Sequence, residues 1–197
     1  QFYDVGAYYG YFSIAARRMY DCDVTAFEAH PTFFATLRRN VDSRTMCVPA
    51  AVSDEDKSQE VWFSAFNIFE GVDNLPPEAM KPRGIGATGK AKIAFLRLDG
   101  WRKSAVPDVV KIDVEAYQAK AVAGLMGTAR QSRPWVIIEL HDPEKLARFG
   151  TTNAETIAPL LAAGYEGYWC GNFRDADARF EPITAMEERL GLGVFVR

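Results

Sequence analysis

Short apolar runs alternate with amphipathic segments along most of the chain. A short apolar run that ends at a glycine or an acid is typical of a buried strand, whereas apolar residues three or four positions apart indicate one face of a helix. The pattern predicts strands at 2–5, 23–28, 46–52, 60–66, 92–98, 108–113, 135–140, 165–170 and 192–196, the last at an edge of its sheet. It predicts helices at 13–20, from Pro31 onward, at 117–126 and at 154–163.

Strands and helices that alternate in this way predict an α/β protein, built of βαβ units around a mostly parallel sheet with helices on both faces. The 197 residues are expected to form a single domain. Ligands of such open sheets bind beyond the carboxyl ends of the strands. The residues that end the predicted strands are therefore the first candidates for function.

One stretch, residues 67–91, is rich in proline and glycine and shows neither the apolar run of a strand nor the three- or four-residue spacing of a helix. Loops of this length are uncommon inside compact domains and often serve as lids or binding loops. We expect an irregular segment that covers a bound substrate.

Composition excludes several classes of protein. The net charge of −3 and the pI near 5.5 argue against nucleic acid as a partner, which usually requires a basic stripe. Cys22, Cys47 and Cys170 are odd in number and far apart, which predicts buried free thiols in a reducing, cytoplasmic setting. No apolar run is long enough for a transmembrane segment. The first residue, Gln1, lies directly on a predicted strand, so we expect the sequence to be part of a longer chain.

Acidic residues stand at the ends of five predicted strands, namely Asp4, Glu28, Asp99, Asp113 and Glu139. Because the carboxyl ends of parallel strands meet at one edge of the sheet, we expect these side chains to surround a ligand site.

Two glycines follow the first strand in the stretch Asp4-Val5-Gly6-Ala7-Tyr8-Tyr9-Gly10. A sharp turn from strand to helix requires positive φ, which glycine adopts at low cost. Ser13 stands where a dinucleotide-binding turn has its third glycine, which argues against an NAD-dependent enzyme. An acid at the strand tip suits an ammonium group, and Glu28 has the spacing of a ribose-binding acid. The pattern therefore indicates S-adenosyl-L-methionine, a nucleoside joined to an amino acid.

Several segments of the chain together resemble the FkbM-type S-adenosylmethionine-dependent methyltransferases. The matching segments are DVGAYYGYFS, FEAHP, AAVSDE, VVKIDVEAYQAKAVAGL and PWVIIELH, in the family's order. The resemblance implies a Rossmann-like class I methyltransferase fold with a mixed, mostly parallel seven-stranded sheet. It also implies O-methylation of a hydroxyl on a small molecule, sugar or glycolipid.

The resemblance further implies which residues hold the cofactor. The set is Asp4, Gly6, Ala7, Tyr8, Gly10, Glu28, Ala29, Ala51, Val52, Asp54 and Asp113. The residues of the first turn would hold the amino-acid part, and Glu28 would accept hydrogen bonds from both ribose hydroxyls. Ala51 and Val52 would flank the adenine, with Asp54 at its amino group.

Five polar residues would lie near the transferred methyl group, namely Lys111, Asp113, Glu115, Glu139 and His141. Transfer to a hydroxyl requires alignment of the acceptor and removal of its proton. His141 is the first candidate for the base, because the ordinary pKa of histidine is about 6.5, and Asp113 is its competitor. The clustered carboxylates could instead hold a divalent cation, an interpretation that we do not favour over acid–base catalysis.

Four positions depart from the family pattern: Tyr8 replaces Asn, Ala29 replaces Pro, Ala116 replaces Gly and Gln118 replaces Glu. These departures bear on the acceptor more than on the cofactor. Two alternatives stay open. One is an RNA or cap ribose methyltransferase of the same fold, which would need a lysine-rich site, and the other is a non-catalytic module that binds the cofactor.

Overall fold

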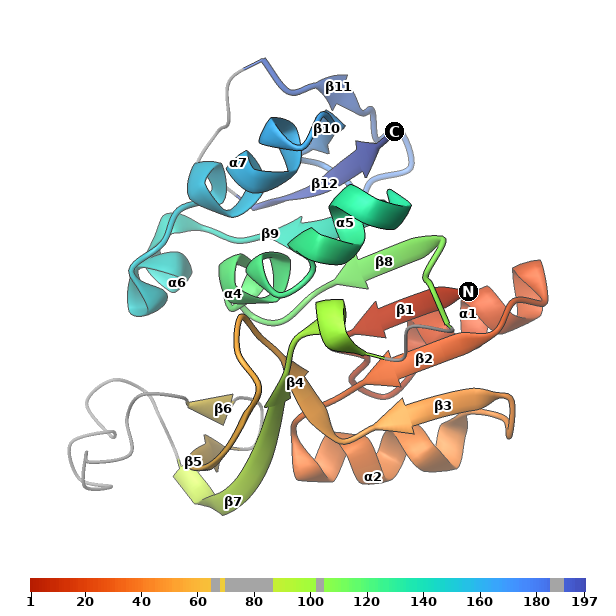
Figure 1. Ribbon diagram of the computed structural model, residues 1–197, viewed down its shortest axis with the longest axis vertical. Helices are drawn as coiled ribbons and strands as arrows, with labels where there is room; N and C mark the ends of the chain where they lie inside the picture. Colours follow the sequence, from red (N-terminus) through yellow and green to blue (C-terminus); the bar gives the residue numbers. More distant parts are fainter. Residues whose placement is uncertain (65–67, 70–86, 102–104, 185–189) are drawn as a thin grey trace.

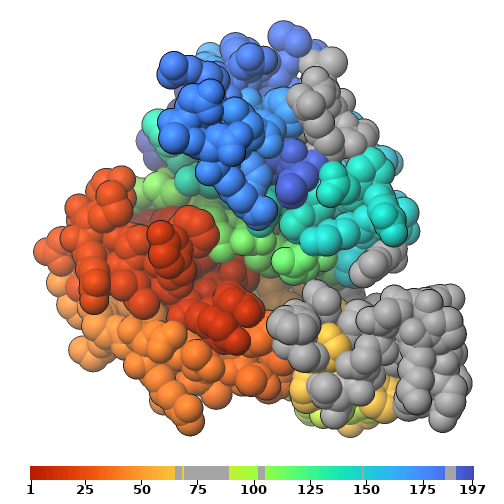
Figure 2. Space-filling model, turned by 180° about the vertical axis from the view of Figure 1, so that it is seen from behind, coloured from red at the N-terminus to blue at the C-terminus, as the bar shows by residue number. Residues whose placement is uncertain are grey.

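The computed structural model describes residues 1–64, 68–69, 87–101, 105–184 and 190–197 (Figure 1). The strands of its main sheet are β1 (Phe2–Val5), β2 (Val24–Phe27), β3 (Thr45–Val48), β8 (Val109–Ile112), β9 (Trp135–Leu140), β10 (Glu166–Cys170), β11 (Glu181–Pro182) and β12 (Gly191–Val196). Their order across the sheet is β11-β10-β12-β9-β8-β1-β2-β3. In the space-filling view, the middle of the chain accordingly lies between the N-terminal and C-terminal parts (Figure 2).

The main sheet is mixed. Strands β3, β2, β1, β8 and β9 pair in parallel, whereas β12, β10 and β11 add antiparallel pairs. The sheet has eight strands rather than the expected seven, because the two-residue strand β11 extends it. The prediction of an edge strand at 192–196 is wrong, since β12 lies between β9 and β10. Its alternating burial, with Phe195 completely buried, suits this interior position.

Helices cover both faces of the main sheet. Helix α1 (Tyr11–Tyr20) and helix α2 (Pro31–Asn40) lie on one face, and α4 (Gln118–Ala123), α5 (Met126–Ser132) and α7 (Asn153–Ala162) lie on the other (Figure 1). Three short elements complete the described helices: α6 (Pro143–Leu146), η2 (Leu98–Gly100) and η3 (Ala147–Phe149). The helix predicted at 117–126 is split at Gly124, where a β-carbon would come within 1.8 Å of the carbonyl oxygen of Ser53. No helix in the described part of the chain is long and apolar enough to cross a bilayer.

The hydrophobic core of the described residues forms three clusters, two of them against the main sheet and one on the second sheet around Val61, Ile93 and Phe95. The larger cluster joins residues of β1, β2, β8, β9 and β12 to the inner faces of α4, α5 and α7, with Leu125 and Leu160 fully buried. A smaller cluster packs Ala7 and Ala26 against Leu37 of α2. Close packing on both faces fixes the strand tips, and it therefore fixes the residues that follow them.

A second, four-stranded sheet lies beside the main one. Its strands are β4 (Ala50–Val52), β5 (Lys57–Ser64), β6 (Ile68–Phe69) and β7 (Ala87–Leu96), in the order β4-β7-β5-β6. The prediction of one strand at 46–52 is wrong, because Pro49 has no N–H for a continuous ladder and the chain leaves the main sheet there. The predicted irregular stretch is strand at 68–69 and from 87 onward, and the remainder of it lies outside the described residues.

The three cysteines are free thiols, as expected. Only Cys170 is buried, whereas Cys22 and Cys47 are partly exposed, so the expectation of three buried thiols is wrong for two of them.

Candidate functional site

A cavity of about 480 Å³ lies where the carboxyl ends of β1, β2 and β8 meet the second sheet. In Figure 1 the arrowheads of β1 and β2 point toward the side on which β4 and β7 lie. The predicted site residues that line it are Gly6, Ala7, Tyr8, Glu28, Ala29, Ala51, Val52, Lys111, Asp113 and Glu115. Cavities of about 300–1,000 Å³ hold cofactors and drug-sized molecules, so the sequence brings most of the predicted set together around a space of suitable size.

The two glycines of the first turn have different structural roles. Gly6 has φ +75°, and a β-carbon there would lie 1.9 Å from the carbonyl oxygen of Asp113. Gly10 has φ +91°, and a β-carbon there would press on the side chain of Leu37 at 2.8 Å. Gly6 therefore lets the turn approach the tip of β8, whereas Gly10 lets α1 pack against α2 and does not line the cavity.

Asp4 does not line the cavity, and its carboxylate pairs with Lys111 of the neighbouring strand β8. The parallel register places Asp4 opposite Lys111, and the Lys111 Nζ donates hydrogen bonds of 3.0 Å to the Asp4 Oδ1 and to the carbonyl of Gly6. The Ser13 hydroxyl donates to the Asp4 Oδ2 at 2.7 Å. Asp4 is fully buried. The structure thus uses Asp4 to hold Lys111 at the cavity wall.

Glu28 is held by backbone donors with its carboxylate facing the cavity. The N–H of Tyr8 donates to Oε2 at 2.8 Å, and the N–H of His30 donates to Oε1 at 2.7 Å. Burial raises the pKa of this carboxyl, and the two backbone donors offset part of that effect. Each carboxylate oxygen retains a lone pair that can accept a further hydrogen bond.

His30 lines the cavity, although the sequence analysis did not select it. Its Nε2 lies 2.8 Å from the carbonyl oxygen of Ser64, so in the neutral ring Nε2 carries the proton and Nδ1 is an acceptor. His30 is 3% exposed and stacks on Phe33, and its Nδ1 has no hydrogen-bond partner among the described residues. A buried acceptor left unpaired beside a cavity indicates a ligand donor. The position of His30 in FEAHP, two residues after the acid expected to bind the ribose, was the available signal.

Tyr8 occupies the left-handed region of backbone conformation, with φ +52°. Its ring packs on Tyr9 and Phe33, with ring centroids 3.9 and 4.4 Å apart. Asn, the family residue, tolerates this conformation better than Tyr does. The substitution of Asn by Tyr therefore replaces a small polar group at the cavity with an aromatic wall.

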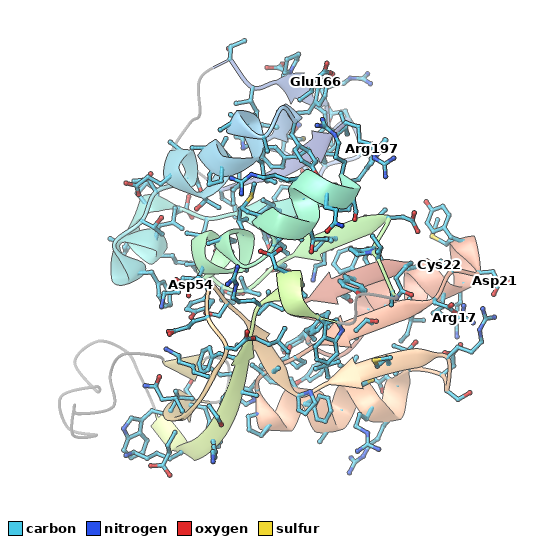
Figure 3. The ribbon with its side chains drawn as sticks, in the orientation of Figure 1. Arg17, Asp21, Cys22, Asp54, Glu166 and Arg197 are labelled. Carbon is cyan, nitrogen blue, oxygen red and sulfur yellow. The ribbon has the colours of Figure 1, made fainter. Side chains whose placement is uncertain are left out.

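Two of the predicted acids lie away from the cavity. Asp54 is exposed and accepts a hydrogen bond from the Ser53 hydroxyl at 3.0 Å (Figure 3). Asp99 accepts from the backbone N–H of Thr128 at 2.7 Å, close to the start of α5. The expectation for Asp99 rested on its place at the end of the predicted strand 92–98, whereas the expectation for Asp54 rested on the family resemblance alone. Since β4 and β7 pair in the second sheet, the residues that follow them point elsewhere.

Asp113, Glu139 and His141 meet beside the cavity at the tips of β8 and β9. One ligand atom of each lies within 4.8 Å of the others. Burial, reinforced by Asp113, raises the pKa of Glu139 to about 7. Burial, with the charge of Lys145 as a lesser cause, lowers the pKa of His141, so its imidazole is neutral at pH 7. Asp113 lines the cavity, whereas Glu139 and His141 lie behind it and do not.

The turn after β8 carries two of the departures from the family pattern. Ala116 has φ +80° and is 1% exposed, a backbone conformation that favours the glycine of the family. The side-chain amide of Gln118 donates to the carbonyl of Glu139. Gln118 thus ties α4 to the end of β9, and Glu115 reaches outward to Lys145, 2.9 Å away.

A mixed sheet with helices on both faces and a cavity at the tips of β1, β2 and β8 fits a class I methyltransferase fold. The chain belongs to the FkbM methyltransferase family, because the description "Methyltransferase FkbM domain" matches residues 4–166. The family predicted from the sequence, and with it the class of methyltransferase domains, is confirmed.

Solved structures support the fold. A methyltransferase FkbM from Methylobacillus flagellatus superposes with a TM-score of 0.59 at 13% identity, over 99% of this chain and 43% of that one. A TehB-like SAM-dependent methyltransferase from Corynebacterium glutamicum superposes with a TM-score of 0.53 at 10% identity, over 100% of this chain and 79% of that one. The chain thus spans less than half the length of the FkbM structure. No curated protein sequence matches the chain.

Proposed function

We propose that this chain is an S-adenosylmethionine-dependent O-methyltransferase that acts, as a single domain, on a hydroxyl of a small molecule, sugar or glycolipid. The observation that carries the proposal is the cavity between the glycine turn, Glu28 and β4, in a chain of a methyltransferase family. When bound, the cofactor supplies an electrophilic methyl group on a sulfonium.

The residues around the cavity fit such a cofactor. Glu28 offers two oxygens to ribose hydroxyls, and the apolar residues Ala51 and Val52 offer a surface to the adenine. The unpaired Nδ1 of His30 is an acceptor for a cofactor hydroxyl or amino group. The backbone of Gly6 and Ala7 borders the same space, where it suits the amino-acid part.

The acceptor hydroxyl would bind on the side of the cavity formed by Asp113. Removal of its proton is assigned to the group of Asp113, Glu139 and His141. A carboxyl whose pKa is about 7 and a neutral imidazole are both able to accept a proton at physiological pH. Lys111, held by its contact with Asp4, places its side-chain nitrogen at this wall of the cavity.

Calorimetric titration with S-adenosylhomocysteine tests the cofactor assignment. We expect the Glu28→Ala variant to bind at least about tenfold more weakly, because hydrogen bonds to a charged group contribute about 1.5–3 kcal/mol. Glu60→Ala, which removes an exposed acid from β5, is the matched control and should bind like the wild type. Equal affinity of all three proteins would contradict the assignment.

The acceptor assignment requires a separate experiment. The protein is incubated with S-adenosylmethionine and a panel of hydroxyl, amine and thiol compounds, and the products are identified by mass spectrometry. We expect methyl ethers. Methylation confined to nitrogen or sulfur would overturn the O-methylation proposal and leave the cofactor assignment intact.

A further inference from the structure

The group of Asp113, Glu139 and His141 is built by the register of two parallel strands. Ile112 of β8 lies opposite Ile138 of β9, so the next residues, Asp113 just beyond β8 and Glu139 still within β9, lie side by side. His141 follows Glu139 by two positions, so its side chain lies on the same side of the chain, close to Asp113 and Glu139. Two carboxylate oxygens and one imidazole nitrogen therefore lie within 4.8 Å of one another.

His141 lacks the partners that a buried imidazole requires. It is 2% exposed, and neither Nδ1 nor Nε2 has a hydrogen-bond partner among the described residues. Buried polar atoms without partners are rare, because each forfeits its hydrogen bonds to water. The imidazole also lies next to two carboxylates without donating to either of them. This arrangement indicates a ligand that binds the imidazole and the carboxylates together.

The two cations that contact these carboxylates, Lys111 and Arg174, do not bind the imidazole and both carboxylates together. Lys111 makes its shorter contacts with Asp4 and the carbonyl of Gly6, and its Nζ is 3.7 Å from the Asp113 Oδ2. Arg174 contacts one oxygen of Glu139 at 2.9 Å from a side chain that is 70% exposed. Neither cation touches the imidazole. Asp113 and Glu139 thus place two carboxyl groups side by side, and a cation between them would be attracted by the oxygens of both.

We propose that Asp113, Glu139 and His141 bind one divalent transition-metal ion. Two carboxylate oxygens with one imidazole nitrogen form a mixed donor set that suits ions such as Mn²⁺ better than Ca²⁺, which takes oxygen ligands throughout. The three residues leave coordination positions open, and Asp113 also lines the cavity. The ion would therefore bind the acceptor hydroxyl and lower its pKa, and the three side chains would then serve as its ligands in place of the proton-accepting role assigned to them without a metal. This role for the ion rests on the proposed methyltransferase function, whereas the metal binding itself does not.

Mn²⁺ titration of the metal-free protein, followed by electron paramagnetic resonance, tests the proposal. We expect one tightly bound Mn²⁺ per chain. Glu139→Gln and His141→Gln should each weaken binding by at least about tenfold, since even outer partners of metal ligands contribute that much. Glu144→Gln removes an exposed acid from the adjoining helix α6 and should bind Mn²⁺ like the wild type. Circular dichroism confirms that each variant is folded.

The outcomes separate this proposal from the methyltransferase assignment. S-adenosylhomocysteine is titrated in the presence of a chelator, where we expect it to bind without the metal. Binding of S-adenosylhomocysteine by a protein that binds neither Mn²⁺ nor Zn²⁺ would overturn the metal site and retain the cofactor assignment. Mn²⁺ binding that all three variants retain would place the ion elsewhere and would likewise overturn this site. Mn²⁺ binding without any S-adenosylhomocysteine binding would support the metal site and contradict the proposed function.

Discussion

Lys111 and Asp4 face each other across the pairing of β1 with β8, with 3.0 Å between Nζ and Oδ1. Both side chains are almost completely removed from solvent. The family resemblance assigned Asp4 to the cofactor's ammonium group. Instead, the lysine ammonium of the neighbouring strand takes that position.

Removal of the lysine should therefore destabilise the fold. We expect Lys111→Met to lower the free energy of unfolding by about 3–5 kcal/mol, because it leaves the Asp4 carboxylate buried without its cation. The double variant Asp4→Asn/Lys111→Met should recover much of that loss. Urea unfolding of the single and double variants gives the coupling energy. Additive losses would show that the two charges do not stabilise each other.

Glu28 should make stability depend on pH. Burial raises its folded-state pKa above the ordinary 4.5, so the stability that its protonated form contributes is fully present below pH 4.5. As the pH rises through the folded-state pKa, the unfolded chain has already released the proton, and this contribution is lost. Glu28→Gln does not titrate. The unfolding free energy of the wild type minus that of Glu28→Gln should therefore fall between pH 4 and pH 7 when measured in urea. A difference that rises with pH would mean that the two backbone donors outweigh burial.

Ala116 offers a gain in stability. We expect Ala116→Gly to raise the free energy of unfolding by about 1 kcal/mol, because a left-handed conformation is unfavourable for alanine and free of strain for glycine. Ala158→Gly, at an exposed position inside α7, should instead lower it by about 1 kcal/mol. Thermal unfolding of both variants checks the contrast. A loss at both positions would show that the Ala116 methyl group stabilises more through packing than its backbone conformation costs.

His30 should contribute to cofactor affinity through its unpaired nitrogen. His30→Phe keeps a ring on Phe33 and removes the Nδ1 acceptor, so we expect about tenfold weaker binding of S-adenosylhomocysteine, the equivalent of one hydrogen bond. Thr32→Val, at an exposed position on α2, is the control and should bind like the wild type. Calorimetry measures both. Unchanged affinity of a folded His30→Phe protein would remove His30 from the cofactor site.

The sequence predicted the features that depend on local pattern. The first strand, its glycine turn and the acid that ends the second strand lie within 28 residues of sequence, so their spacing alone indicated where Glu28 would lie. The partners of Asp4 and His30 could not be predicted in this way. Lys111 reaches Asp4 through a strand register, and Ser64 reaches His30 from the second sheet. Whether the chain continues in one sheet after Pro49 likewise depends on long-range packing. That packing places β7, and with it Asp99, away from the expected edge of the main sheet.

The break at Pro49 also gives the cavity two walls of different origin. Gly6, Glu28 and Asp113 follow parallel strands that are locked between layers of helices, whereas Ala51 and Phe95 belong to the separate sheet. Changes in the length or side chains of that smaller sheet leave the β1–β2–β8 register untouched. Since Ala51 and Val52 are the residues proposed to face the adenine and Asp113 is proposed to face the acceptor, substitutions in β4 should change cofactor affinity without altering the acceptor side of the cavity.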